Sequence, residues 1–215
     1  MKKRLAALLA AVMLLVCSCA GQSSSSSAPS SAASDGGTSQ TGQPPRQLEL
    51  EEMKNLILES AMQAPSAGCQ QLYTILDITN QELKEKLAES CDHQPFIAKA
   101  PMVLVFCADC KKWYDAYLET GCEPRTPGVG DLMLAVTDTV IAAQNAVVAA
   151  ESLGIGSCYI GDIMENCEEH RRLLQLPDYV FPAAMLVLGW PTLQQKQRKK
   201  PTRCEQKYIV HENAY

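Results

Sequence analysis

The sequence predicts an α+β domain of three layers, with helices on both faces of a central mixed β-sheet. Two apolar runs of strand length, 101–108 and 181–190, carry almost no polar residues, and a shorter strand-like run lies at 72–78. A run that is apolar at every position is typical of a strand buried on both faces. Segments with helical periodicity lie between these runs, so the helices are expected to cover both sides of one sheet.

The first half of the domain is predicted to alternate helix and strand. Apolar residues recur near one helical face over 48–64, and Pro65 ends that helix. A second helix is expected to begin after Asn80, whose side chain suits the N-cap position. A third helix is expected just after the central strand, over 109–120.

The dominant predicted element is a helix of about six turns over 131–154. It is apolar on nearly every face, with few polar interruptions: Thr137, Asp138, Gln144 and Asn145. A helix apolar on all sides must be buried on all sides, and a domain of this size rarely provides that alone. Part of its surface is therefore expected to pack on another subunit.

A short strand at 157–160, an amphipathic helix at 164–176 and the strand at 181–190 complete the predicted order. Three glycines precede or end the short strand: Gly154, Gly156 and Gly161. Their spacing is not that of a dinucleotide-binding loop, which follows a strand and opens a helix. Gly154 stands where a helix C-cap glycine belongs, and Gly156 suits a turn.

The N-terminal residues predict export and a lipid anchor. Residues 1–19 have a basic start, an apolar stretch and a cysteine after small residues, which resembles a lipoprotein signal with Cys19 as the acylated residue. An ordinary signal peptide cleaved near Ala20 is the alternative. Residues 20–47 are rich in Ser, Gly and Pro and predict a disordered tether, which leaves 48–215 as the folded domain. The expected location is the outer face of a bacterial cell membrane.

Charge and cysteine content restrict the possible functions. Without Lys2, Lys3 and Arg4 the chain has 16 basic and 24 acidic residues, a net charge of −8, which argues against a nucleic-acid partner. Cys107 and Cys110 form a single CxxC without a second pair at zinc-ribbon spacing. No metal site is therefore expected, and the pair is either a local disulfide or two free thiols.

Four segments, in order, resemble the nitroreductase family of FMN-dependent flavoproteins, which fold as intertwined homodimers. They are APSAGCQQLY at 64–73, DTVIAAQNAVVAAESLGIGSCYIGDI at 138–163, LLQLPDYVFPAAMLVLGWP at 173–191 and the tail KKPTRCEQKYIVHENAY at 199–215. The resemblance implies a homodimer with bound FMN. It also implies ping-pong hydride transfer from a small-molecule donor, NAD(P)H or another reductant, to nitroaromatic, quinone or flavin-like acceptors.

The resemblance also implies which residues meet FMN. The backbone of Ile160 and Gly161 would pass the flavin ring, where a glycine allows close approach. Arg203, helped by Lys200, would bind the phosphate. The remaining implied cofactor-binding residues come from the segment 64–73: Ser66, Cys69 and Gln71. No catalytic side chain is implied, because the flavin carries the hydride.

The chain departs from the family pattern in three places. The basic Arg-Ser-x-Arg segment before the first helix is replaced by residues in which only Arg46 is basic. Cys69 takes the place of an asparagine, and Leu72-Tyr73 that of Pro-Trp.

Two alternatives therefore stay open: a flavin-free binding protein with this fold, and a thiol-redox protein that uses Cys107 and Cys110. In addition, DGGTSQT at 35–41 loosely resembles a site of covalent FMN attachment, which would be Thr41.

Overall fold

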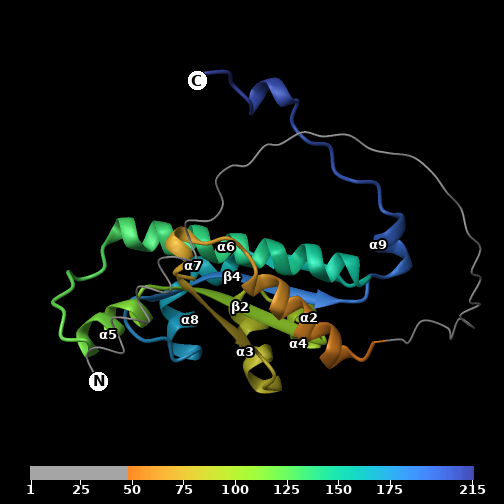
Figure 1. Cartoon of the computed structure of the whole chain (residues 1–215). Helices are drawn as coiled ribbons and strands as arrows, with labels where there is room; N and C mark the ends of the chain where they lie inside the picture. Colours follow the sequence, from red (N-terminus) through yellow and green to blue (C-terminus); the bar gives the residue numbers. More distant parts are fainter. Residues whose placement is uncertain (1–47) are drawn as a thin grey trace, which may run out of the picture. The chain divides into compact units, whose positions relative to one another are not determined.

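The computed structural model describes residues 48–215, which form helices around a single four-stranded sheet (Figure 1). The strand order is β1-β2-β4-β3. The strands are β1 (Tyr73–Asp77), β2 (Met102–Asp109), β3 (Gly156–Ile160) and β4 (Val180–Gly189). The α+β class is confirmed, but the three strand pairings described are all antiparallel, where a mixed sheet was expected. The reason is that β4 inserts between β2 and β3, which run in the same direction but never pair.

Two layers of helices cover the sheet. The helices α2 (Leu50–Met62) and α6 (Val129–Ser152) pack on one face. The opposite face is covered by α3 (Gln81–Ser90), α4 (Pro95–Lys99), α7 (Asp162–Glu165) and the segment around α8 (Cys167–Leu173). Figure 1 shows α6 running along one side of the sheet and α3 and α8 on the other.

The central strand β2 supplies both cores. Met102, Leu104 and Phe106 belong to the cluster under α2 and α6. Val103 and Val105 point into the opposite cluster, and all these side chains are buried. Alternation along the strand thus divides one continuous apolar run between two layers. The prediction of a central strand buried on both faces is confirmed.

Helix ends follow the local chemistry that the sequence indicated. The Asn80 side chain accepts a hydrogen bond from the Leu83 N–H at 2.9 Å, which confirms its role as N-cap of α3. Gly154 has a φ of +77°. Its N–H donates to the Glu151 carbonyl and the Ile155 N–H to the Ala150 carbonyl, the pair of bonds that ends a helix at a left-handed residue. The helix-cap reading of Gly154 is therefore confirmed.

The long helix α6 is buried on one side only. Its alanines face the sheet, and their small size lets the helix approach the strands closely. The opposite side is exposed and largely apolar. We call it the α6 stripe: Val129, Met133, Thr137, Val140, Gln144 and Val148. Val129 is 77% exposed and Met133 62%. By length and composition α6 could cross a membrane, alone among the described helices, but its packing on the sheet is that of a core helix.

Buried polar groups tie the helices of the second layer together. His170 of α8 is fully buried, and its Nδ1 lies 2.8 Å from the Ile163 carbonyl of α7. A carbonyl only accepts, so Nδ1 carries the proton, and Nε2 lies 2.9 Å from the Ser90 hydroxyl at the end of α3. This histidine joins three helices and does not line a cleft.

The C-terminal residues leave the body of the domain. After β4 come α9 (Leu193–Gln197) and a 3-10 turn, η2 (Gln206–Tyr208), and every residue from Thr192 onward is exposed. Figure 1 shows this tail running away from the sheet. Tyr208, Ile209 and Val210 are each more than half exposed. The tail thus offers apolar side chains to a surface other than its own domain.

Candidate functional site

The segment between α2 and β1 is a strained loop, and it contains the residues expected to meet FMN. It includes a short 3-10 turn, η1 (Ala67–Cys69). Gly68, Cys69 and Gln71 all have φ values between +50° and +56°. Cysteine and glutamine adopt this left-handed region rarely, and such residues cluster at functional sites. Asparagine, which the resembled family has in place of Cys69, adopts this conformation more readily than cysteine does.

Asp138 of α6 holds this loop from one side. Its side chain is 3% exposed, yet it is the only charged residue in the interior of the helix. One carboxylate oxygen accepts from the Ala67 N–H at 2.9 Å, and the other is 3.4 Å from the Leu72 N–H. These two amides lie at the two ends of the turn, so the Asp138 carboxylate fixes the distance between those ends.

The helix α5 (Lys111–Glu119) holds the same loop from the other side. The Trp113 indole N–H donates to the Gln70 carbonyl at 2.8 Å. The Lys112 ammonium donates to the carbonyls of Gln71 at 3.1 Å and Tyr73 at 2.6 Å. The start of α5 is itself fixed, because Asp109 accepts from the Lys111 and Lys112 N–H groups. The loop is therefore bound by acceptors on α6 and donors on α5.

The side chains of Ser66 and Gln71 are partly used within the loop. The Ser66 hydroxyl oxygen accepts from the Gln71 N–H at 3.0 Å, which leaves its proton free to be donated. The Gln71 amide nitrogen donates to the Met62 carbonyl at 3.1 Å. Cys69 is exposed at the tip of the turn. Ser66 and Gln71 thus stabilise the conformation of the loop. The Ser66 hydroxyl proton and the exposed turn at Cys69 are available to a ligand.

The second candidate segment, Ile160–Gly161, lies at the end of β3. Ile160 is buried, so only its backbone is available to a ligand. Gly161 is exposed, its φ of −76° suits any residue, and a Cβ built on it would meet nothing within 4 Å. Neither backbone conformation nor crowding in the chain requires a glycine here. Open space against a bare backbone fits a flat group such as a flavin ring, which a side chain would push away.

The two segments stand at opposite edges of the sheet. The loop at 66–71 leads into β1 and Gly161 follows β3, and these are the outer strands. Three strand spacings of about 4.8 Å separate the outer strands by about 14 Å. The structure of one chain therefore does not bring the two halves of the expected site together. Tyr159, two residues before Gly161, donates to Gln144 of the α6 stripe at 3.4 Å, so this half borders the exposed helix face.

The expected phosphate-binding residues lie on the exposed tail. Lys200 and Arg203 form no ion pair within the described residues. No hydrogen bond joins them to Ser66 or Gly161 within this part of the chain. Their charges are thus available, but the structure of a single chain does not place them at either half of the site. Cys19 and Thr41 lie outside the described residues.

The thiol pair of the alternative hypothesis is not assembled. Cys107 lies in the cluster under α3 and Cys110 in a separate cluster beside α6, and all eight cysteines of the described residues are free. Burial raises the pKa of Cys107 to about 12, and burial also raises the pKa of Cys110. A reactive thiol needs the opposite shift. Among residues 48–215 no three His, Cys, Asp or Glu side chains are grouped to hold a metal ion.

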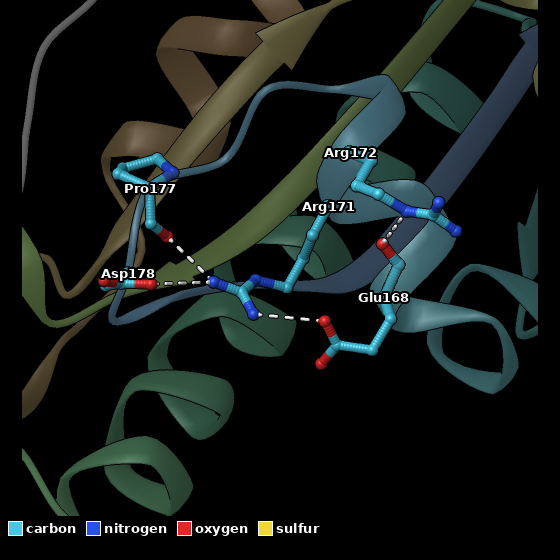
Figure 2. A network of polar contacts seen from close by, with 5 residues as sticks. All are labelled: Glu168, Arg171, Arg172, Pro177 and Asp178. Atoms are coloured by element: carbon cyan, nitrogen blue, oxygen red, sulfur yellow. Dashed lines mark hydrogen bonds and ion pairs between the residues drawn. The ribbon is translucent and has the colours of Figure 1, made fainter.

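A hollow of about 520 Å³ lies near the start of α6, and Arg171 is one of the residues that line it. Figure 2 shows the Arg171 guanidinium between the carboxylates of Glu168 and Asp178, each at 3.3 Å, with the Pro177 carbonyl at 3.5 Å. These contacts fasten the turn before β4 to α8. Both carboxylates are largely exposed, so the ion pairs add little stability and the arginine serves mainly to shape the turn.

Comparison with known proteins identifies the family. The model of the Nitroreductase family matches residues 46–190, two thirds of the chain. The chain belongs to the nitroreductase family. The resemblance stated from the sequence motifs is thereby confirmed, and the domain is described below as a nitroreductase domain.

Named relatives agree with this assignment. The chain is 35% identical over 184 residues to an FMN reductase [NAD(P)H] of Bacillus subtilis, covering 82% of this chain and 69% of that protein. It is 37% identical over 166 residues to an oxygen-insensitive NADPH nitroreductase of Salmonella typhimurium, covering 77% and 66%. Among solved structures, the NfrA1 nitroreductase of B. subtilis matches with a TM-score of 0.73 and 32% identity, covering 79% and 68%. The chain spans about two thirds of the length of these relatives.

Sequence reasoning missed the side chains that hold the loop. Lys112 and Trp113 gave no signal, because a helix after a strand commonly carries such residues on its surface. Asp138 did give one, because it interrupts an apolar helix, and a charge inside such a helix calls for a buried partner. That partner is backbone in a distant loop, which only the fold reveals.

Replacing Asp138 by asparagine tests its role in the site. One amide oxygen can replace one acceptor, but the amide NH₂ then faces the second loop N–H. We expect a loss of about 1.5–3 kcal/mol in the free energy of unfolding. We also expect FMN affinity to fall about tenfold, measured by urea unfolding and fluorescence titration. Thr139→Val is the matched control, since the buried Thr139 hydroxyl bonds only to Ala135 within α6. Unchanged FMN affinity in Asp138→Asn would show that the loop is not part of the flavin site.

Proposed function

We propose that this nitroreductase domain is an FMN-dependent oxidoreductase, which passes electrons from NAD(P)H to nitroaromatic, quinone or flavin-like acceptors. The observation that carries the proposal is Gly161, whose backbone is open to a flat group although the chain does not require a glycine there. The relatives named FMN reductase and nitroreductase support the same cofactor and reaction class.

The protein's contribution is to bind and orient. When bound, FMN supplies the two-electron chemistry. The open backbone at Gly161 would lie against the ring, and the loop at 66–71 would contact its polar side through backbone groups and the Ser66 hydroxyl. Lys200 and Arg203 would pair with the phosphate, since they have no carboxylate partner in the described residues. The arginines missing near residue 46 make these two the main source of positive charge for the site.

The reaction balances as two half-reactions at one site. NAD(P)H gives up a hydride, which is two electrons and one proton, and leaves as NAD(P)⁺. A quinone then takes two electrons and two protons to become a hydroquinone, the second proton coming from solvent. A nitro group takes the same two electrons and two protons and loses water to become a nitroso group. No side chain of the described site needs to act as an acid or base in this scheme.

A homodimer is part of the proposal, because one chain keeps the two halves of the site apart. In a twofold dimer, a patch near β1 of one chain meets a patch near β3 of the other. The helix α6 reaches both halves from different sides: the buried Asp138 binds the loop, and Gln144 of the exposed α6 stripe contacts Tyr159. The stripe and the apolar tail are the surfaces that such a dimer would bury.

The Gly161 backbone tests the proposed function directly. Gly161→Val should leave the fold intact, because the new side chain enters open space, but should lower FMN affinity about 100-fold, or roughly 3 kcal/mol. Absorbance after gel filtration with FMN reports binding, and thermal unfolding reports the fold. Ser157→Val places the same side chain at an exposed position of β3 and should keep the flavin. A wild-type protein that stays colourless in excess FMN would rule out the oxidoreductase and favour the flavin-free binding protein.

A charge on the α6 stripe tests the dimer. Val140→Glu places a carboxylate at the centre of the stripe, where burying it unpaired is costly. Sedimentation velocity should show a dimer for the wild type and a monomer for this variant, with weaker FMN binding because the two halves no longer meet. Leu118→Glu changes an equally exposed apolar residue on α5 and should remain dimeric. A dimeric Val140→Glu variant with normal flavin content would contradict the proposed interface.

We also propose that the protein is anchored by a lipid at Cys19, outside the cytoplasm, which rests on the pattern of residues 1–19 alone. Expression in a bacterial host with a clickable palmitate analogue should label the wild type and place it in the membrane fraction. Cys19→Ala should lose both the label and the membrane association, whereas Cys17→Ala should keep them. A labelled Cys19→Ala protein would contradict this assignment.

A further inference from the structure

The basic residues of the domain are concentrated in one short segment after β4. Residues 190–203 contain five Lys or Arg and no Asp or Glu, whereas residues 48–189 contain 9 basic and 21 acidic residues. The five are Lys196, Arg198, Lys199, Lys200 and Arg203. Each is exposed, and none forms an ion pair within the described residues. A charge asymmetry of this kind is typical of a surface that meets an anionic partner.

Three of these cations have no role in the proposed flavin site. Lys200 and Arg203 are assigned to the FMN phosphate, which carries about two negative charges at neutral pH and is matched by two cations. Lys196, Arg198 and Lys199 are left over. They are therefore available to a second anionic partner.

Two exposed apolar side chains stand directly before the three cations. Trp190 is 58% exposed and Leu193 is 76% exposed. Trp190 follows the last residue of β4 and lines a small hollow there, so it is attached to the rigid end of the sheet. Tryptophan is enriched at the boundary between lipid headgroups and hydrocarbon, and basic residues beside apolar ones are typical of chains that bind a membrane surface.

The segment lies at the end of the domain where the predicted tether begins. Leu50, in the first turn of α2, lines the same hollow as Trp190, and residues 20–47 come just before it in the chain. Figure 1 shows α9 beyond the end of β4. Charges are screened over about 8 Å at physiological ionic strength. An anionic surface next to α9 therefore attracts the three cations more than it repels the acidic body of the domain.

We propose that residues 190–199 form a membrane-docking surface for a bilayer with anionic headgroups. Lys196, Arg198 and Lys199 bind the headgroups, and Trp190 lies at their level. The exposed apolar side chains favour a bilayer over a soluble polyanion, which has no hydrocarbon to cover them. The inference depends neither on flavin binding nor on acylation of Cys19, although an anchor at Cys19 would hold the domain near the same bilayer.

Vesicle binding measures the contribution of the three cations. The full-length chain with Cys19→Ala is the parent, and the triple variant adds Lys196→Gln, Arg198→Gln and Lys199→Gln. The parent should prefer vesicles of phosphatidylcholine with phosphatidylglycerol over phosphatidylcholine alone. The triple variant should bind the anionic vesicles about 100-fold more weakly, or about fivefold for each charge removed. High salt should abolish the difference, because it screens the charges.

A matched control removes the same charge elsewhere. Lys86→Gln, Lys99→Gln and Arg172→Gln together neutralise three exposed basic residues of α3, α4 and α8, and this chain should bind as the parent does. FMN affinity should be the same in the parent and the triple variant. A loss of FMN affinity in the triple variant would assign the three cations to the flavin phosphate and overturn the membrane surface.

Tryptophan quenching tests lipid contact even if the N-terminal residues bind vesicles on their own. The chain has two tryptophans, and Trp190→Phe keeps only Trp113. Brominated phosphatidylcholine in the anionic vesicles should quench the parent, and both Trp190→Phe and the triple variant should lose this quenching. Quenching of Trp190 that is absent, or equal with and without phosphatidylglycerol, would overturn the proposal. Binding of the parent to heparin without a preference for anionic vesicles would also overturn it, in favour of a soluble polyanion.

Discussion

The loop at 66–71 depends on one buried carboxylate. Asp138 is placed in the most apolar helix of the domain, where an ion without partners would be costly. It is accommodated because two loop N–H groups donate to it, and those amides have no other acceptor among residues 48–215. The two N–H groups stabilise the buried carboxylate, and the carboxylate satisfies the two N–H groups. With Lys112 and Trp113 holding the carbonyls, the strained turn keeps a conformation that its cysteine and glutamine would not adopt alone.

The helix α6 links packing to function. One of its sides is alanine-rich and close to the sheet, so it can run the length of the domain and contact both outer strands. Its other side leaves the apolar α6 stripe exposed, and Gln144 of this stripe contacts Tyr159, beside the Ile160–Gly161 half of the candidate site. The exposed side of α6 is thus the surface on which a second chain could pack. That chain could bring the missing half of the site. Dimerisation and cofactor binding are therefore expected to be lost together.

The three glycines after α6, Gly154, Gly156 and Gly161, have different structural roles. Gly154 is required by its positive φ, and the two hydrogen bonds of the helix end explain it fully. Gly156 begins β3 opposite Gly189 instead of forming the expected turn, and a Cβ on it would lie in ordinary van der Waals contact with the Gly189 carbonyl, at 3.4 Å. Gly161 has a negative φ, and a Cβ built on it would meet nothing within 4 Å. The open space at Gly161, together with its place at the end of β3 where the family resemblance puts the flavin ring, is why it carries the proposed function.

The sequence by itself determined the layers, the central strand, the cap at Asn80 and the family, because these depend on periodicity and local chemistry along the chain. It also located both candidate segments, Ser66–Gln71 and Ile160–Gly161. Only the tertiary structure decided that β4 separates β2 from β3, that the two segments lie at opposite edges, and that Cys107 and Cys110 face different clusters. The same holds for Asp138, Lys112 and Trp113. Their partners lie about 40 to 70 residues away in the chain, and no local pattern encodes a contact that exists only after the sheet has formed.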